Sequence, residues 1–293
     1  MGPGVDGDQG LRKLSLHGRP RLQLGLLLSG PLGWLGIAYL GSLAVLFAAA
    51  FWHLDSFSGE VVRGFSFQNF QTLWDSDVYR TIAVRTIAIA AAVTVTDAVI
   101  ALPIAFYMAK VAAPRTRNLL LVAVLMPLWS SYLVKVYAWR TILAEDGILN
   151  WVLEPFGLKG PGFGNVATWL VFSYLWLPYM IIPLYAGMER IPDSLLDASG
   201  DLGGKPWTTV RRVVLPLALP AMVAGSIFTF SLTLGDYITP GLVSSTQFIG
   251  NVVYNNVGVA NNLPLAAAFA TVPVVVMVLY LLGARRLGAF DSL

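Results

Sequence analysis

The sequence contains no cysteine, which excludes disulfide bonds, a thiol nucleophile and a thiolate metal site. Histidine is scarce as well: the only two, His17 and His53, lie far apart on expected loops. This separation argues against a shared metal site. Charged residues make up 12% of the chain, whereas soluble domains carry roughly 25%. So few charges do not cover a water-exposed surface, and most of the exterior is therefore expected to face lipid.

Apolar residues are abundant instead, at 56% of the chain, with a mean hydropathy of +0.69. A helix that crosses the bilayer core needs about 20 mostly apolar residues. The stretches that qualify are 31–52, 86–109, 118–138, 166–188, 213–236 and 264–284. The first is too long for a cleaved signal peptide and lacks a clear cleavage site, so we interpret it as an uncleaved span. The sequence thus predicts an all-α polytopic membrane protein with about six transmembrane helices.

Lysine and arginine gather in alternate segments: the N-terminal tail, residues 110–117, residues 189–212 and the end of the chain. The positive-inside rule makes these segments cytoplasmic, so both termini are expected inside. The same distribution accounts for a pI of about 9.2 without a nucleic-acid partner. The expected parts are a cytoplasmic tail (1–29), a first span with its external loop (30–84), a core (85–286) and a cytoplasmic tail (287–293).

Two expected external segments, 66–74 and 147–158, place aromatic residues among polar ones. That composition is typical of helices at the membrane surface, with substrate contact as the alternative.

The cytoplasmic loop 189–212 is polar and punctuated by glycine. Pro192 and Asp193 are expected to open a short helix, because proline suits the first turn and an acid suits the positive end of the helix dipole. Gly203 and Gly204 then allow a sharp reversal with left-handed backbone angles. A second helical stretch begins at Pro206 and runs into the next span. Such a loop either docks a short helix into another protein or is a plain amphipathic connector.

The spacing in this loop favours docking. It resembles the signature loop of the membrane subunits of binding-protein-dependent ATP-binding-cassette (ABC) importers, which runs E-A-A, three residues, G, nine residues, I-x-L-P. The matching residues are Asp197, Ala198, Ser199, Gly203, Val213, Leu215 and Pro216, with Gly204 beside the glycine of the pattern. The resemblance implies a type I importer permease fold over about residues 85–285. It also implies that the loop's short helix couples the permease to a cytoplasmic ATPase.

A phosphate-binding loop of the form G-x-x-x-x-G-K-[ST] is missing. In the nearest match, Ser199 stands where the first glycine belongs and Pro206 where the Ser or Thr belongs. We therefore expect no cofactor in this chain, and the resemblance implies that ATP and Mg²⁺ are bound by the partner ATPase.

Residues 126–150 and 229–241 also look like the membrane subunits of spermidine/putrescine-type importers. This narrower resemblance implies a bacterial inner-membrane assembly of two different permease subunits, two ATPase subunits and an extracytoplasmic solute-binding protein. Relatives in that subfamily handle other small solutes, such as amino-acid derivatives, opines or iron, so these remain alternatives.

Charged residues inside spans are costly and usually face a cavity or a partner. Asp97 and Asp236 are such residues, and carboxylates beside aromatic rings suit an ammonium group. The expected substrate path comprises Asp97, Trp129, Ser130, Tyr132, Tyr174, Trp176, Asp236 and Tyr237. Alternatively, the aromatic residues are interfacial or packing groups, and Asp97 is a satisfied interhelical hydrogen-bonding group near Thr94 and Thr96. Lys135 would repel a cation unless it pairs with a carboxylate or points to the outer interface.

Two other functional classes remain. A secondary transporter driven by protons or sodium could use Asp97, but the two related halves usual for such proteins are not visible. A membrane-embedded enzyme would need a nucleophile, an acid–base pair or a metal cluster at membrane depth, and the sequence shows none. We therefore expect a transporter subunit without enzymatic activity.

Overall fold

A computed structural model describes residues 20–55 and 57–286 of the chain. The expected tail 287–293 and most of the tail 1–29 lie outside these residues. The chain divides into two units, up to Ala49 and from Ala50 onward. In the first unit, α1 (Pro20–Trp34), η2 (Leu35–Leu40) and α2 (Gly41–Ala49) follow one another. The apolar stretch 27–49 in these helices is long enough to span a bilayer, and its described side chains are largely exposed, as suits a lipid environment.

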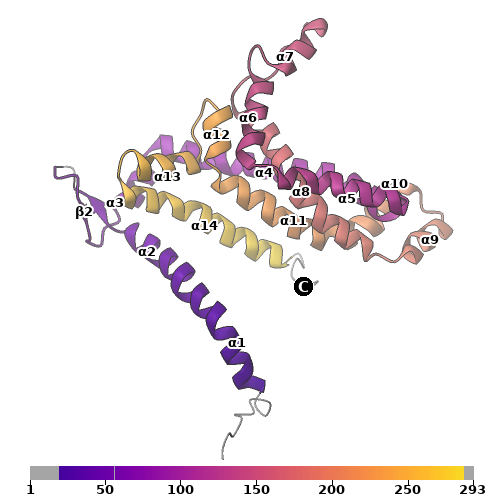
Figure 1. Cartoon of the computed structure of the whole chain (residues 1–293), viewed down its shortest axis with the longest axis horizontal. Helices are drawn as coiled ribbons and strands as arrows, with labels where there is room; N and C mark the ends of the chain where they lie inside the picture. The colour runs from indigo at the N-terminus through magenta and orange to yellow at the C-terminus, as the bar shows by residue number, and fades with distance from the viewer. Residues whose placement is uncertain (1–19, 56, 287–293) are drawn as a thin grey trace, which may run out of the picture. The chain divides into compact units, whose positions relative to one another are not determined.

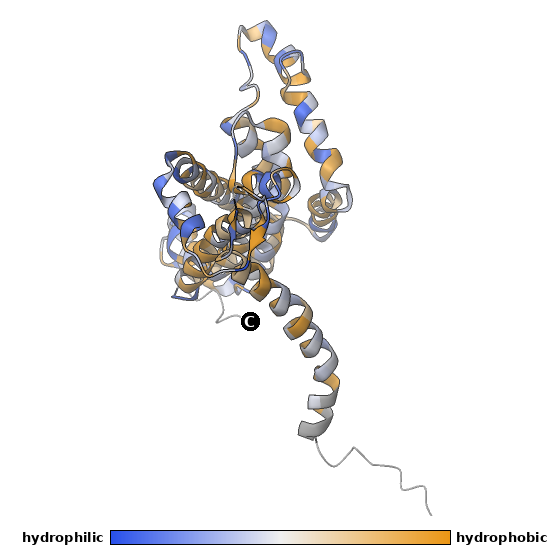
Figure 2. Cartoon of the chain, turned by 90° about the vertical axis from the view of Figure 1, so that its left-hand side faces the viewer, coloured by the Kyte–Doolittle hydropathy of each residue, from blue (hydrophilic) through white to orange (hydrophobic). Residues whose placement is uncertain are grey.

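Four long helical segments make the bundle of the second unit (Figure 1). They are α4 with η3 (Asp77–Phe106 and Tyr107–Val111), α8 (Asn165–Glu189), α10 with η5 and α11 (Pro206–Thr209, Val210–Val214 and Leu215–Gly235), and α14 (Leu263–Arg286). Each is long and apolar enough to cross a membrane. Figure 2 shows orange, hydrophobic stretches among the white ones of the bundle. With the first unit's span, five of the six predicted spans are confirmed as continuous helices.

Small residues let α8 pack closely against α11. A Cβ built on Gly187 would lie 2.3 Å from the Cβ of Ala221, and one on Gly225 would lie 3.0 Å from the sulfur of Met180. Toward the end of the bundle that carries α9 (Asp193–Asp201), a buried core joins α4, α8 and α11; its members include Ala101, Met108, Met180, Leu184, Met188 and Val214. Tight interhelical contact through small residues is the usual means of association inside membranes.

The prediction of one continuous span over 118–138 is wrong. The chain instead forms α5 (Pro114–Trp129) and α6 (Tyr132–Leu143), which meet at an angle of 93°. Ser130 and Ser131 between them have extended backbones. The carbonyl of Pro127 accepts bonds from the Ser130 hydroxyl at 2.9 Å and from the Lys135 ammonium at 3.0 Å. These bonds satisfy a backbone group that the break leaves without a helical partner.

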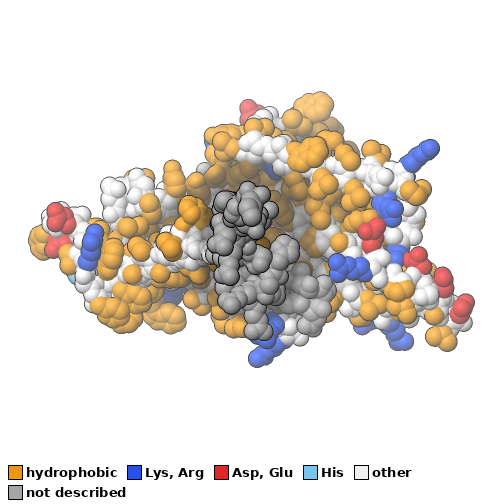
Figure 3. All heavy atoms as spheres, turned by 60° about the horizontal axis from the view of Figure 1, so that its bottom comes forward, with side chains coloured by type: hydrophobic (Ala, Val, Ile, Leu, Met, Phe, Trp, Pro, Cys, Tyr) orange, Lys and Arg blue, Asp and Glu red, His pale blue; other side chains and the backbone are white. Residues whose placement is uncertain are grey.

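Shorter elements lie at the two ends of the bundle. Near one end are the hairpin β1–β2 (His53–Leu54 paired with Val61–Val62), α3 (Gln68–Asp75), α12 (Ile238–Val243) and α13 (Ile249–Gly258). The helices α7 and η4 (Ile148–Leu153 and Glu154–Phe156) follow α6 away from the bundle (Figure 1). The helices predicted within 66–74 and 147–158 are thus present. The opposite end carries α9 and the start of α10, and charged side chains gather there (Figures 1 and 3). The cytoplasmic placement of the termini stays a prediction.

Candidate functional site

The predicted short helix of the polar loop is present as α9, followed by a turn that ends it. Asp193 occupies the first turn of α9, and Pro192 precedes it in an extended conformation. Gly203 has φ +75°, which favours glycine because a Cβ would be strained there. Its N–H donates to the carbonyl of Gly200 at 2.8 Å, and the N–H of Gly204 donates to the carbonyl of Ser199 at 2.8 Å. This pair of bonds is the Schellman motif, which terminates helices at glycine.

The left-handed backbone predicted for Gly204 is wrong, because only Gly203 of this pair has a positive φ. Gly204 is constrained in another way. A Cβ there would lie 2.6 Å from both the carbonyl and the hydroxyl oxygen of Ser199. Glycine is therefore required at Gly203 by backbone conformation and at Gly204 by the closeness of the helix end.

Ser199 also connects the two halves of the loop, since its hydroxyl lies 2.8 Å from that of Thr209 in α10. Between the halves is a hollow of about 580 Å³. Its lining includes Leu195, Ala198, Ser199, Leu202, Gly203, Gly204, Lys205, Arg212 and Val213. Leu202 is 90% exposed. The exposed Leu202 side chain thus gives the polar turn an apolar edge.

The remaining signature residues lie around this hollow. Asp197 and Ala198 are exposed on α9, and Val213 and Leu215 are half-buried where η5 meets α11. Pro216 is exposed in the first turn of α11. The pattern therefore runs from the exposed face of α9 to the start of the next span.

A second site lies at the far end of α11, where a cavity of about 400 Å³ opens. It brings together four residues of the predicted path, namely Tyr132, Trp176, Asp236 and Tyr237; Ser231, Leu232, Gly235 and Ile238 complete the lining. The rings of Tyr132 and Trp176 are stacked, with centroids 5.9 Å apart and planes 10° apart. The cavity therefore combines a carboxylate with flat aromatic surfaces.

Asp236 follows the last residue of α11, and its carboxylate is well supported. One oxygen accepts the N–H groups of Ile238 and Thr239 at 2.8 and 3.0 Å, which caps α12. The other accepts the hydroxyl of Tyr132, which also lies 2.6 Å from the hydroxyl of Thr239. Among the described residues, none of the ion pairs includes Asp236. The site therefore holds a carboxylate in place without a protein cation opposite it.

Asp97 does not join this cavity. It is fully buried where α4 faces α8, and neither of its carboxylate oxygens has a hydrogen-bond partner among the described residues. The alternative that Asp97 is a satisfied interhelical group near Thr94 and Thr96 is therefore wrong for the described residues. Thr94 donates to the backbone of its own helix, and Thr96 accepts an indole N–H from α8. The hydroxyl of Ser173 lies near the Asp97 carboxylate, but the two groups do not form a hydrogen bond.

The other predicted path residues lie outside the cavity. Trp129 is 85% exposed at the end of α5, and Ser130 bonds to the backbone of the break. Tyr174 packs against Trp139, with ring centroids 5.4 Å apart. Lys135 does not line the cavity either, because its ammonium is bonded to the carbonyl of Pro127.

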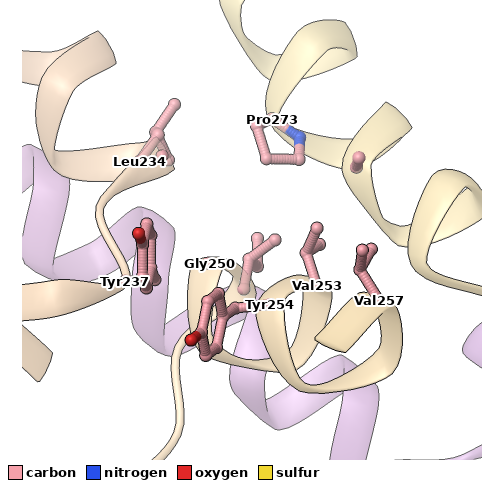
Figure 4. Close-up of a pocket in the computed structure, with 10 residues that line it drawn as sticks. Leu234, Tyr237, Gly250, Val253, Tyr254, Val257 and Pro273 are labelled. Atoms are coloured by element: carbon pink, nitrogen blue, oxygen red, sulfur yellow. The ribbon is translucent and has the colours of Figure 1, made fainter. Parts of the chain in front are cut away.

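Tyr237 also borders an adjoining apolar pocket of about 430 Å³ between α11, α13 and α14 (Figure 4). Its ring stacks on that of Tyr254, with centroids 4.7 Å apart. Leu234, Val253 and Pro273 supply apolar surface around this pair. Tyr237 thus borders both spaces, and its stacking partner Tyr254 lines the apolar one.

Sequence reasoning missed several residues at the two sites. Thr239 donates its N–H to Asp236 and its hydroxyl contacts that of Tyr132. An aspartate at the start of a turn commonly accepts backbone N–H groups that follow it, but that tendency does not indicate the contact with Tyr132. The basic segment 110–117 predicted orientation alone, yet Lys110 bonds to the start of α9 and Arg117 bonds to the end of α8. No local signal reveals these bonds, because their partners lie more than 70 residues away.

Comparison with known proteins gives a consistent result. Residues 91–289 match the family described as "Binding-protein-dependent transport system inner membrane component". The "Inner membrane ABC transporter permease protein YdcU" of Escherichia coli strain K12 is 46% identical over 290 residues, covering 94% of this chain and 92% of that protein. The "Spermidine/putrescine transport system permease protein PotB" of Haemophilus influenzae is 29% identical over 218 residues, covering 72% and 76%.

Solved structures show the same fold. A chain of the bacterial alginate ABC transporter, solved with an alginate-bound periplasmic protein, superposes with a TM-score of 0.72 at 16% identity, covering 91% of this chain and 94% of that one. A chain of the MetNI methionine ABC transporter in an inward-facing conformation gives a TM-score of 0.57 at 17% identity, covering 73% and 95%.

Proposed function

Because the chain belongs to the family of binding-protein-dependent transport system inner membrane components, we propose that it is the permease subunit through which an ABC importer carries a polyamine such as putrescine or spermidine. The family and the apolar helices make it a multi-pass inner-membrane protein of an ABC importer and not an enzyme. The family does not specify the solute, so the choice of a polyamine is the proposed part.

The observation that carries the proposal is the cavity around Asp236. A polyamine presents ammonium groups joined by short alkyl chains. The Asp236 carboxylate offers the opposite charge, and the stacked rings of Tyr132 and Trp176 offer π surfaces. Each cation–π contact contributes about 0.5–2 kcal/mol. Lys135, the nearby cation that could oppose binding, is bonded to a backbone carbonyl instead.

The relatives support this substrate class, since proteins named as spermidine/putrescine permeases align over 72% of the chain. The fold does not decide between solutes, because the superposed structures belong to alginate and methionine transporters. An importer of another small solute is therefore the alternative, and the charge in the cavity is the feature that favours a cation.

We further propose that α9 docks on a cytoplasmic ATPase, which binds ATP and Mg²⁺ in place of this chain. The assembly would contain a second, different permease subunit, two ATPase subunits and an extracytoplasmic solute-binding protein. The exposed apolar edge of α9 supports the docking role, and a relative of the same fold was solved with a periplasmic protein.

The test is uptake of radiolabelled putrescine and spermidine by vesicles that contain the assembled importer. Asp236→Asn keeps the oxygen that caps α12 but removes the charge. We expect uptake at low substrate to fall about 10- to 100-fold, which corresponds to the roughly 1.5–3 kcal/mol of a charged hydrogen bond. Asp146→Asn, at an exposed site in the loop before α7, should leave uptake unchanged.

Asp97→Asn belongs in the same series, because Asp97 was predicted in the path but is buried away from the cavity. Unchanged uptake in both Asp236→Asn and Asp97→Asn would remove the carboxylates from the path. Transport by vesicles without any ATPase subunit would instead contradict the importer mechanism.

A further inference from the structure

Lys110 lies at the end of the α4 span, within η3. Its side chain is only 8% exposed. The ammonium donates to the carbonyl of Ile191 at 2.6 Å and to the Asp193 carboxylate at 2.8 Å. A buried lysine is favourable only when its charge is paired and its donors are used. Lys110 meets both conditions by binding the two residues that flank the start of α9.

A second tie lies just before this point. Glu189, the last residue of α8, accepts a bond from the Arg117 guanidinium of α5 at 3.3 Å. The same oxygen accepts the hydroxyl of Tyr185 at 2.5 Å. The short segment 189–193, which joins α8 to α9, is therefore bonded at one end to α5 and at the other to η3.

Apolar packing fixes the same segment from inside. Ile191 is 6% exposed and belongs to one buried core with Met108 of η3, Met188 of α8 and Val214 of η5. Leu196 of α9 packs against that core. Close-packed groups transmit displacement because they compress little. The start of α9 therefore has little freedom to move without α4 and α8.

The opposite end of α9 is held differently. There the Schellman turn and the Ser199–Thr209 contact join α9 to α10 and so to α11. Within the described residues, the ammonium of Lys110 is the only side-chain cation that bonds to α9 from another spanning helix. The polar part of the link from α9 to α4 thus depends on this one side chain, beside the apolar packing of Leu196.

We propose that Lys110 is a positioning residue that locks α9 to the end of α4, so that a displacement of α9 by a docked ATPase moves α4 together with α8. This inference rests on the proposed docking at α9 and is independent of the solute. Without the lock, α9 would pivot on its glycine end, and ATP hydrolysis would be poorly converted into movement of the spans.

The structural test uses the absence of native cysteine. Thr116→Cys and Asp201→Cys place spin labels at exposed positions of α5 and of the far end of α9. In the full-length permease we expect Lys110→Met to broaden the distance distribution between the two labels. Lys205→Met, which alters an exposed lysine in the same loop, should leave the distribution unchanged, as should Lys110→Arg, which keeps the cation.

The functional test uses the assembled importer in nanodiscs, with ATP hydrolysis measured with and without the loaded binding protein. We expect Lys110→Met to lower the stimulation by the binding protein about 5-fold or more, the lower end of typical coupling between sites. Basal hydrolysis and co-purification of the ATPase should persist. A merely structural role would reduce both activities together.

The outcomes separate the two proposals. An unchanged label distance together with unchanged stimulation overturns the role of Lys110, whatever the solute is. Failure of the ATPase to co-purify with the wild-type chain would instead overturn the docking proposal. If the Lys110→Met variant does not accumulate, Asp193→Asn provides the test. This variant retains the hydrogen bond between Lys110 and Ile191 but removes the carboxylate charge that pairs with Lys110. Normal stimulation of ATP hydrolysis by the binding protein in Asp193→Asn then counts against the lock.

Discussion

Gly200 and Gly203 provide an internal comparison within the signature loop. Both are exposed, and a Cβ at either position would meet no atom within 4 Å. They differ in backbone conformation: Gly200 lies inside α9, whereas Gly203 has φ +75° just beyond its end. A substitution at either glycine therefore acts through the backbone and not through a clash.

The two substitutions should have opposite signs. A left-handed conformation costs a residue that has a Cβ about 1–2 kcal/mol, so Gly203→Ala should destabilise the end of α9 by that amount. Gly203→Val should cost more, because its side chain is β-branched. Gly200→Ala replaces glycine within a helix and should stabilise α9 by up to about 1 kcal/mol. The difference in local stability is then about 1–3 kcal/mol.

Hydrogen exchange at the amide of Gly204 measures this difference, because that N–H closes the turn on Ser199. The cost at Gly203 corresponds to a roughly 5- to 30-fold increase in opening. Gly203→Val should still insert in the membrane but lose assembly with the ATPase or coupling to it. Equal exchange in Gly203→Ala and Gly200→Ala would refute the reasoning, as would normal transport-linked ATP hydrolysis in Gly203→Val.

Two further predictions concern helix packing and the segment between Ala50 and α3. Gly187→Ala should destabilise the pair α8–α11 by about 1–3 kcal/mol, because its Cβ would lie 2.3 Å from that of Ala221; thermal unfolding in detergent measures the loss. Asn69→Ala should loosen the loop that joins Ala50 to α3 by about 1–3 kcal/mol, because the buried amide donates to the carbonyls of Ala50 and Trp52 at 2.9 and 2.7 Å. Limited proteolysis of the loop should then be faster.

Matched controls are available for both. Gly283→Ala adds a methyl group inside α14 where no atom lies within 4 Å, so it should not lower the unfolding temperature. Asn118→Ala removes an exposed amide from α5 and should leave proteolysis unchanged. If Gly283→Ala lowered the unfolding temperature as much as Gly187→Ala, close packing at Gly187 would not be the cause of the loss. If Asn118→Ala speeded proteolysis as much as Asn69→Ala, the buried amide of Asn69 would not be the cause of the faster cleavage.

The spans and the loop could be predicted because their signals are local. An apolar stretch must become a helix in lipid to satisfy its own backbone groups, so composition alone identified five continuous helices. Proline and glycine impose angles on their own residues, which is why α9 and the turn at Gly203 were predicted correctly. The break after Trp129 was missed, because apolar length does not show where a helix bends.

The sequence by itself determined the class of the protein, its signature loop and four of the residues that meet in the cavity. Only the tertiary structure decided which charges face one another. It placed Asp236 beside Tyr132 and left Asp97 buried outside the cavity. It also bonded Lys110 to the start of α9, 81 residues away in sequence. These pairings depend on how the helices rotate and pack, and nothing in the local pattern of any one helix specifies that.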